Sequence, residues 1–325
     1  MRKRKLKKHT LRRKLANLAT HWLSWALQLV VRRLSLRSVR WLADRVADLL
    51  FGVLRYRRRD MDANLRTAFG DRLDRAQRRR IAKAATRSFV RTVLEFVKSP
   101  QLSDQDMHRL VRVRDFDRFR RAAQAGQGLI LLCAHVGNWE LLGARLARDG
   151  WPIWVIAREH NDDYTASLMR RIREANNMRV VPRDDLRQAL RCLRSGEVLG
   201  ILPDTNVAHG GLLVDFLGRP ATTAPGPALF AMRTGAAVMP CFAVRQPDDT
   251  YLIEFAEPLN LVDTGDREAD LFANTRLMNR AIEDAIRRHP EQWLWMHRRW
   301  KSAPDGQEPS DYRLPPTADG QGAQP

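Results

Sequence analysis

Residues 128–143 read GLILLCAHVGNWELLG, and this stretch decides the fold. It opens with an apolar run, Gly128–Ala134, of the length and composition of a buried strand. His135 ends the run, Gly137 permits a tight turn, and Asn138 is a good N-cap for the helical pattern that follows. The stretch therefore predicts a strand, a turn and a helix in immediate succession.

Outward from this stretch, short apolar runs continue to alternate with helical patterns. This alternation predicts an α/β fold with a mostly parallel central sheet flanked by helices. A last helix is expected from about Arg267 to Arg288, ending before Pro290. The further predicted strands are Ile153–Ala157, Val198–Leu202, Val238–Val244 and Tyr251–Phe255, and the predicted helices are Trp139–Asp149, Asp163–Ala175, Asp184–Ser195 and Pro225–Thr234.

Four regions are expected along the 325 residues. Residues 1–34 hold a basic tail and a membrane-associating helix, and residues 35–110 form an N-terminal helical region. Residues 111–301 form the α/β domain. Residues 302–325 are rich in Pro, Gly, Asp and Gln, which predicts a disordered tail.

The N-terminus predicts an association with membranes. Nine basic residues and no acid occupy positions 2–14, and Leu15–Val31 then contains no full charge. The segment is at the short limit for a spanning helix, and its polar residues recur at helical spacing, as in an interfacial helix. A signal peptide is the least favoured interpretation, because Arg32 and Arg33 follow the apolar stretch where a cleavage site needs small residues. A soluble core helix behind a solvated basic tail stays open as a further interpretation.

The composition restricts the partners. Lys and Arg number 57 against 37 Asp and Glu, a formal net charge of +20 that favours anionic partners such as membrane lipids, acidic proteins or nucleic acid. The three cysteines form no CxxC pair, so neither a disulfide framework nor a zinc site is expected. No helix-turn-helix, zinc-finger or ribonucleoprotein motif is present, so no nucleic-acid partner is expected.

His135 and Glu140 are the first candidates for catalysis. Residues five apart do not share a face of one helix, so a pair requires His135 to lie in the turn before the helix. There Glu140 is expected to hold one imidazole nitrogen and leave the other free as a general base. The alternative is a histidine that merely ends a strand beside a helix-capping glutamate.

Three weaker patterns were considered. Cys133 lies two residues before His135, which would suit a Cys–His nucleophile, although cysteine is more often buried. Asp204 and His209 would supply only two ligands to a metal, so a turn is favoured. The tryptophans among cations in HPEQWLWMHRRWK suit a membrane interface as well as a nucleic-acid surface.

Six segments in a consistent order resemble the lipid A biosynthesis acyltransferases, the late lauroyl and myristoyl transferases within the lysophospholipid acyltransferase superfamily. The resemblance covers roughly residues 55–301 and includes the HX4E motif of the family, here HVGNWE. The other segments are RYRRRDMDANLRTAF, AREHNDDYTASLMRRIREANNMRVV, GEVLGILPDTN, GGLLVDFLGRPATTAPGPALFAMRTGAAVMPCF and HPEQWLWMHRRWK.

The resemblance implies roles for individual residues. His135 corresponds to the general base, Glu140 to its partner, and Arg173 to an arginine at the active site. Where the family usually has a stretch like Asp-Gln-Asp, this chain has PDTN. The residues implied in substrate binding are Arg158, Asp204, Asn206, Arg219, Arg298 and Arg299.

The resemblance also implies the reaction. An acyl chain would pass from a thioester, on acyl carrier protein or coenzyme A, to a hydroxyl of a lipid A precursor, without a cofactor or a metal. The expected place is the cytoplasmic face of the inner membrane. Acylation of a lysophospholipid, glycolipid or aminolipid is the alternative within the fold, and a non-catalytic binding protein is the distant one.

Overall fold

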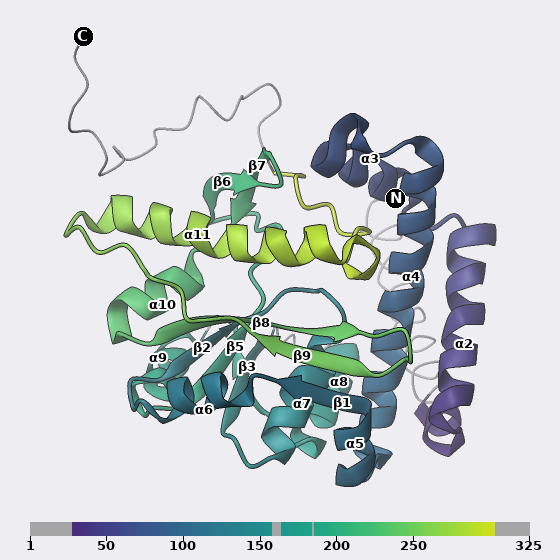
Figure 1. Cartoon of the computed structure of the whole chain (residues 1–325), viewed down its shortest axis with the longest axis horizontal. Coiled ribbons are helices and arrows are strands. Elements are labelled where there is room, and N and C mark those ends of the chain that lie inside the picture. The colour runs from purple at the N-terminus through teal and green to yellow at the C-terminus, as the bar shows by residue number, and fades with distance from the viewer. Residues whose placement is uncertain (1–27, 158–163, 184, 303–325) are drawn as a thin grey trace, which may run out of the picture.

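A seven-stranded sheet forms the centre of the computed structural model, which describes residues 28–157, 164–183 and 185–302 (Figure 1). The strand order is β1-β9-β8-β2-β5-β3-β4, and a separate hairpin pairs β6 with β7. The strands are β1 (Val111–Arg114), β2 (Leu129–Leu132), β3 (Ile153–Ala157), β4 (Arg179–Pro182), β5 (Val198–Ile201), β6 (Leu212–Phe216), β7 (Arg219–Thr223), β8 (Ala237–Arg245) and β9 (Tyr251–Phe255).

Neighbouring strands of the large sheet are parallel except for β8 and β9, which pair antiparallel. The prediction of a mostly parallel sheet flanked by helices is confirmed. The bounds of β3, β9 and α11 (Arg267–Arg288) match the sequence prediction. β1, β4 and the β6–β7 hairpin were not predicted, because arginine, aspartate or proline residues interrupt the apolar residues in each of these strands.

Both faces of the sheet are covered by helices, as a buried parallel sheet requires. On β2, Ile130 and Leu132 point into a core with α11, while Leu129 and Leu131 point into a second core with α7. The remaining helices are α2 (Leu36–Asp48), α3 (Arg58–Phe69), α4 (Arg75–Lys98), α5 (Asp104–Leu110), α6 (Phe116–Gln124), α7 (Trp139–Arg148), α8 (Tyr164–Ala175), α9 (Leu186–Arg194) and α10 (Gly226–Thr234), with a π-helical turn η1 (Leu49–Val53) and 3₁₀ turns η2 (Gly70–Arg72), η3 (Ser99–Gln101) and η4 (Pro290–Gln292).

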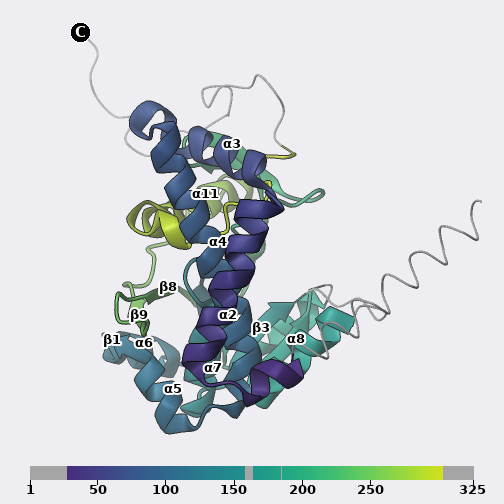
Figure 2. The same ribbon diagram turned by 90° about the vertical axis from the view of Figure 1, so that its right-hand side faces the viewer.

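The N-terminal helices pack on one side of this sandwich, where α2 runs along α4 (Figure 2). Arg91 of α4 forms a bidentate ion pair with Asp44 of α2. Buried residues of α2 and α4, such as Ala43 and Leu94, belong to the same core as β2. The chain thus continues the α/β core into its helical region.

No helix within the described ranges is long and apolar enough to cross a membrane. Most of the predicted membrane-associating segment, Leu15–Val31, lies outside the described residues, as does nearly all of the predicted tail at 302–325.

Candidate active site

The carboxyl ends of β2 and β5 lie side by side, because Leu132 pairs with Ile201 in parallel register. His135 follows Leu132 by three residues, and Asp204 follows Ile201 by three residues. The register therefore brings the two side chains to the same point of the sheet edge, the usual position of a ligand site in parallel α/β folds.

Asp204 holds His135 through two hydrogen bonds. Its Oδ1 lies 2.8 Å from His135 Nδ1, and its Oδ2 accepts the His135 backbone N–H at 2.9 Å. Oδ2 also accepts from the indole N–H of Trp293 at 2.9 Å. Burial alone would raise the pKa of Asp204, but the charge and hydrogen bond of His135 and the Trp293 bond lower it to about 2. The ionised carboxylate can only accept, so Nδ1 carries the proton in neutral His135.

The second ring nitrogen of His135, Nε2, has no hydrogen-bond partner among the described residues. The imidazole side chain is 23% exposed, and the ring of Trp139 packs edge-on against it with centroids 4.7 Å apart. Burial lowers the pKa of His135, but the Asp204 contact and the Glu140 charge outweigh it and raise the pKa. His135 is therefore held in one orientation, and its ring is neutral once the pH exceeds this raised pKa.

Glu140 does not hold His135, contrary to the expectation from the sequence. Its carboxylate accepts from Arg173 at two points, Nε to Oε2 at 3.0 Å and Nη2 to Oε1 at 2.5 Å. Arg173 projects from α8, and Glu140 lies in the first turn of α7. The pair still lies close enough to act on the imidazole, since Glu140 raises the pKa of His135 and Arg173 lowers it. His135, Glu140 and Arg173 thus share one site, with Asp204 as the direct partner of the histidine.

The turn between His135 and α7 depends on two residues. Gly137 has φ +63°, and a Cβ there would meet the Ala243 carbonyl oxygen at 2.0 Å, so a side chain is excluded. Asn138 caps α7 by accepting the Leu141 N–H at 3.0 Å. The amides of Trp139 and Glu140 that follow are N-terminal helix donors, which favour negative charge beside His135.

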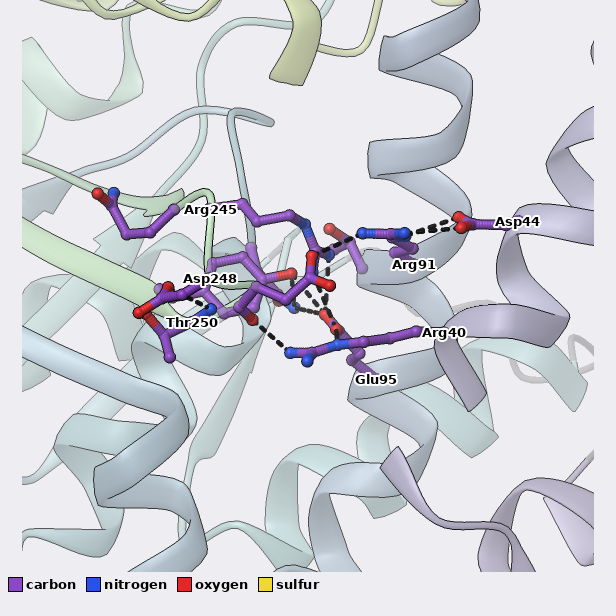
Figure 3. A network of polar contacts seen from close by, with 12 residues as sticks. Arg40, Asp44, Arg91, Glu95, Arg245, Asp248 and Thr250 are labelled. Carbon is purple, nitrogen blue, oxygen red and sulfur yellow. Dashed lines mark hydrogen bonds and ion pairs between the residues drawn. The ribbon is translucent and has the colours of Figure 1, made fainter. Parts of the chain in front are cut away.

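A buried network is bonded to this turn through Asn138, and Figure 3 shows its Glu95, Arg40 and Arg245. Glu95 of α4 is fully buried, and its Oε1 accepts from Arg40 at 2.7 Å and from Arg245 at 3.0 Å. Its Oε2 accepts from Arg245 at 3.0 Å, from Tyr251 at 2.5 Å and from the Asn138 side chain at 3.2 Å. The carboxylate therefore ties the N-cap of α7 to α2, α4, β8 and β9.

Burial of Glu95 raises its pKa, but the charge and hydrogen bonds of Arg245, followed by those of Arg40 and Tyr251, lower it overall. A further hydrogen bond joins α4 to the turn, from Thr92 Oγ1 to the Gly137 carbonyl at 2.9 Å. This network could not be predicted from the sequence, because its members are scattered over α2, α4, β8, β9 and the N-cap of α7 and carry no common motif.

The remaining predicted site residues do not lie together. Asn206 follows Asp204 by two residues. Its backbone N–H donates to His297 Nε2 at 2.9 Å, and its side chain donates to Ser302. Arg219 begins β7 and is half-buried, whereas Arg298 is exposed and binds Asp60 at 3.0 Å. Arg158 lies outside the described residues.

Arg299 is fully buried and supports the hairpin. It donates to the Thr222 carbonyl at 2.7 Å and to Thr223 Oγ1 at 2.5 Å, and its guanidinium stacks on the Phe216 ring at 4.5 Å. Burial lowers the pKa of Arg299 to about 10. These contacts give Arg299 a packing role under β6 and β7 and leave it no exposed surface for a substrate.

Two alternative chemistries find little geometric support. Cys133 is buried, with its sulfur 3.5 Å from that of Cys241, and it packs in the core between β2 and α7. His209 is exposed, while Asp204 is committed to His135. The position of Cys133 does not suit a nucleophile, and the positions of Asp204 and His209 do not suit a metal site.

Comparison with known proteins identifies the family. The model of the bacterial lipid A biosynthesis acyltransferase family matches residues 6–302, so the chain belongs to this family. It is 27% identical to the lipid A biosynthesis palmitoleoyltransferase of Escherichia coli over 207 residues, 63% of this chain and 66% of the relative, slightly under two thirds.

Two further relatives extend the comparison. The chain is 26% identical to the lipid A biosynthesis lauroyltransferase of Escherichia coli over 299 residues, 90% of this chain and 95% of the relative. It is 25% identical to the phosphatidylinositol mannoside acyltransferase of Mycolicibacterium smegmatis over 228 residues, 68% of this chain and 72% of the relative.

Proposed function

We propose that this member of the lipid A biosynthesis acyltransferase family moves a fatty acyl group from a thioester to a hydroxyl of a membrane lipid. The observation that carries the proposal is the His135–Asp204 pair: Nδ1 is held by a buried carboxylate, and Nε2 has no described partner at the carboxyl edge of the sheet. Such a histidine suits general-base chemistry on a hydroxyl. The family match supports acyl transfer as the reaction.

In the proposed reaction, His135 Nε2 removes the proton of the acceptor hydroxyl while its oxygen attacks the thioester carbonyl. A C–O bond forms, and the carbonyl oxygen becomes an oxyanion. The intermediate then expels the sulfur, the C–S bond breaks, and the histidinium returns its proton to the thiolate. Asp204 stabilises the histidinium throughout, because its negative charge remains beside Nδ1.

Arg173 is proposed to stabilise the oxyanion. Glu140 occupies Nε and Nη2 of the guanidinium, and Nη1 has no hydrogen-bond partner among the described residues. A positive charge fixed in this way is oriented before the reaction begins. Burial lowers the pKa of Arg173, but Glu140 outweighs this and raises it, which keeps the arginine charged. Glu140 thus acts as a positioning residue for Arg173.

The preferred acceptor is a lipid A precursor, and the preferred donor is acyl carrier protein. The two relatives from Escherichia coli act on lipid A by name, which supports this acceptor. The net charge of +20 suits a phosphorylated lipid and an acidic donor protein. A glycolipid is the second candidate, because a phosphatidylinositol mannoside acyltransferase is also similar to this chain. The cytoplasmic face of the inner membrane is the proposed place of the reaction.

An acyl-transfer assay tests the proposal. Detergent-purified protein receives labelled acyl carrier protein thioester with a lipid A precursor, a phosphatidylinositol mannoside or a lysophospholipid, and the same acceptors are tested with acyl-coenzyme A. Labelled lipid A precursor is the expected product. Transfer only to another lipid would keep the chemistry and replace the acceptor. No transfer from either donor to any of the three would contradict the proposed function.

A further inference from the structure

An arginine-rich groove of about 1280 Å³ opens between α3 and the first half of α4. Nine of the fifteen residues that line it are arginines, and its two acidic residues are Asp60 and Asp62. Arg298 from the C-terminal segment also lines the groove. It lies outside the His135 cluster, and the reaction proposed above does not use it.

The two acidic residues leave most of this charge unbalanced. Asp60 binds Arg57 and Arg298, each at 3.0 Å, and Asp62 binds Arg78 at 2.8 Å. Arg59 and Arg79 are exposed, and the described residues offer neither of them an ion pair. Guanidinium groups that converge in this way bind phosphate oxygens in a bidentate manner.

The rim of the groove is apolar and exposed. Val53, Leu54 and Tyr56 are 72%, 61% and 51% exposed, and they lie in the same stretch of chain as the lining residues Phe51, Arg55 and Arg57. Trp41 of α2 and Leu49, the first residue of η1, are 64% and 50% exposed. Apolar side chains that project beside a dense cationic surface are typical of a face that contacts an anionic bilayer.

The groove and the catalytic pair share one structural support. Asn64 of α3 donates to the carbonyls of Trp295 and His297 at 2.8 and 2.7 Å. The segment that contains Trp295 and His297 also contains Trp293, which donates to Asp204, and Arg298, which lines the groove. A ligand bound in the groove would therefore lie on the segment that also supports Asp204.

We propose that the arginine groove binds the phosphorylated headgroup of the lipid acceptor while the lipid remains at the membrane surface. The proposal rests on the proposed function and assigns a subsite to its acceptor. The apolar rim favours a membrane lipid over the acidic carrier protein, because a soluble donor has no need of exposed Val53 and Leu54. The carrier protein becomes an alternative that the test distinguishes.

The test is a binding measurement that needs no turnover. Labelled lipid A precursor, with its phosphates or after their enzymatic removal, is titrated into full-length protein in neutral-lipid nanodiscs. The test variant is Arg59→Gln/Arg79→Gln. The matched control is Arg191→Gln/Arg194→Gln, which removes the same charge from exposed positions on α9.

The test variant is expected to weaken binding of the phosphorylated lipid by about tenfold or more, since each lost arginine removes charge-assisted hydrogen bonds. The control and the dephosphorylated lipid should change little. Equal weakening for both lipids, or equal weakening in both variants, would overturn the proposal.

A parallel titration with acyl carrier protein separates the two partners. Binding of the carrier protein that falls in the test variant, with lipid binding unchanged, would assign the groove to the donor and refute the lipid subsite. Because these titrations do not depend on acyl transfer, they can succeed even if the assay of the proposed function fails.

Discussion

Two polar clusters contact the turn from His135 to Asn138: a rear cluster centred on Glu95, and a front cluster of His135, Asp204, Glu140 and Arg173. They differ in how completely their groups are paired. In the rear cluster, both oxygens of the buried Glu95 carboxylate are occupied by Arg40, Arg245, Tyr251 and Asn138. In the front cluster, His135 is partly exposed and its Nε2 has no described partner. Complete pairing fixes a structure, whereas a fixed ring with one open nitrogen can accept a proton.

The same kind of ion pair occurs in both clusters, so its surroundings must distinguish its role. Both clusters contain a carboxylate with a bidentate arginine, Glu95 with Arg245 and Glu140 with Arg173. Their sequence patterns are equally simple, so the pair alone does not identify a role. Proximity to His135 distinguishes the second pair, because Glu140 raises and Arg173 lowers the pKa of His135.

The largest expected effect comes from removing the open nitrogen. His135→Gln should lower kcat by roughly 100- to 10,000-fold, the usual contribution of a general base. Thermal unfolding should change only modestly, because the Gln side-chain amide can still donate a hydrogen bond to the buried Asp204. Acyl-transfer rates and melting curves measure the two quantities, with the exposed His108→Gln as control. Substantial turnover by His135→Gln would remove His135 from the mechanism.

A substitution in the rear cluster should lower the free energy of unfolding. Glu95→Gln leaves Arg245 and Arg40 without their buried counter-charge, which should lower the free energy of unfolding by about 3–5 kcal/mol. Chemical denaturation measures this loss. Glu254→Gln, which removes the exposed pair with Arg114, should cost less than about 1 kcal/mol.

The rear cluster is expected to set the geometry of the turn without entering the reaction. The fraction of Glu95→Gln that remains folded should therefore show the wild-type pH dependence of kcat. A shifted pH profile with unchanged stability would reverse the distinction between the two clusters.

Arg173 tests the electrostatic part of the front cluster. Arg173→Gln should lower kcat by about 100- to 1,000-fold, the range seen when one oxyanion-stabilising group is lost. Arg170→Gln, one turn earlier on α8, serves as the control. Combining Arg173→Gln with Glu140→Gln should cost little beyond Arg173→Gln alone, because Glu140 acts through Arg173. Fully additive losses would give Glu140 a separate role.

The smallest effect is expected at Cys133. Cys133→Ser changes a core residue behind the site, so activity per folded molecule should be retained while stability falls modestly. A complete loss of acyl transfer in folded protein would instead favour a covalent acyl-enzyme.

Local patterns predicted most of the fold and only part of the site. The apolar runs located β3 and β9, and the turn residues located His135 between a strand and α7. The partner of His135 was misassigned, because Glu140 is near it in sequence while Asp204 is near it only through the β2–β5 register. Once these two strands are placed side by side, the equal spacing from Leu132 to His135 and from Ile201 to Asp204 predicts the pair.

Local sequence patterns could not predict the rear cluster either, because its members are far apart in the sequence. Glu95 and Arg245 are 150 positions apart and meet only after α4 packs on the sheet. Each reads in the sequence as one charge among many in a strongly basic chain. Only tertiary packing distinguishes Glu95 from the solvated carboxylates.

The central claim is that Asp204, rather than Glu140, is the direct partner of His135, and the pKa of His135 tests it most directly. The pKa is followed by NMR titration of histidine-labelled protein, with the His135 signal assigned from His135→Gln. It should lie above the ordinary histidine value in the wild type, since Asp204 raises it most strongly and Glu140 less so. It should fall clearly in Asp204→Asn and less in Glu140→Gln. A pKa that is unchanged in Asp204→Asn and falls in Glu140→Gln would contradict the account.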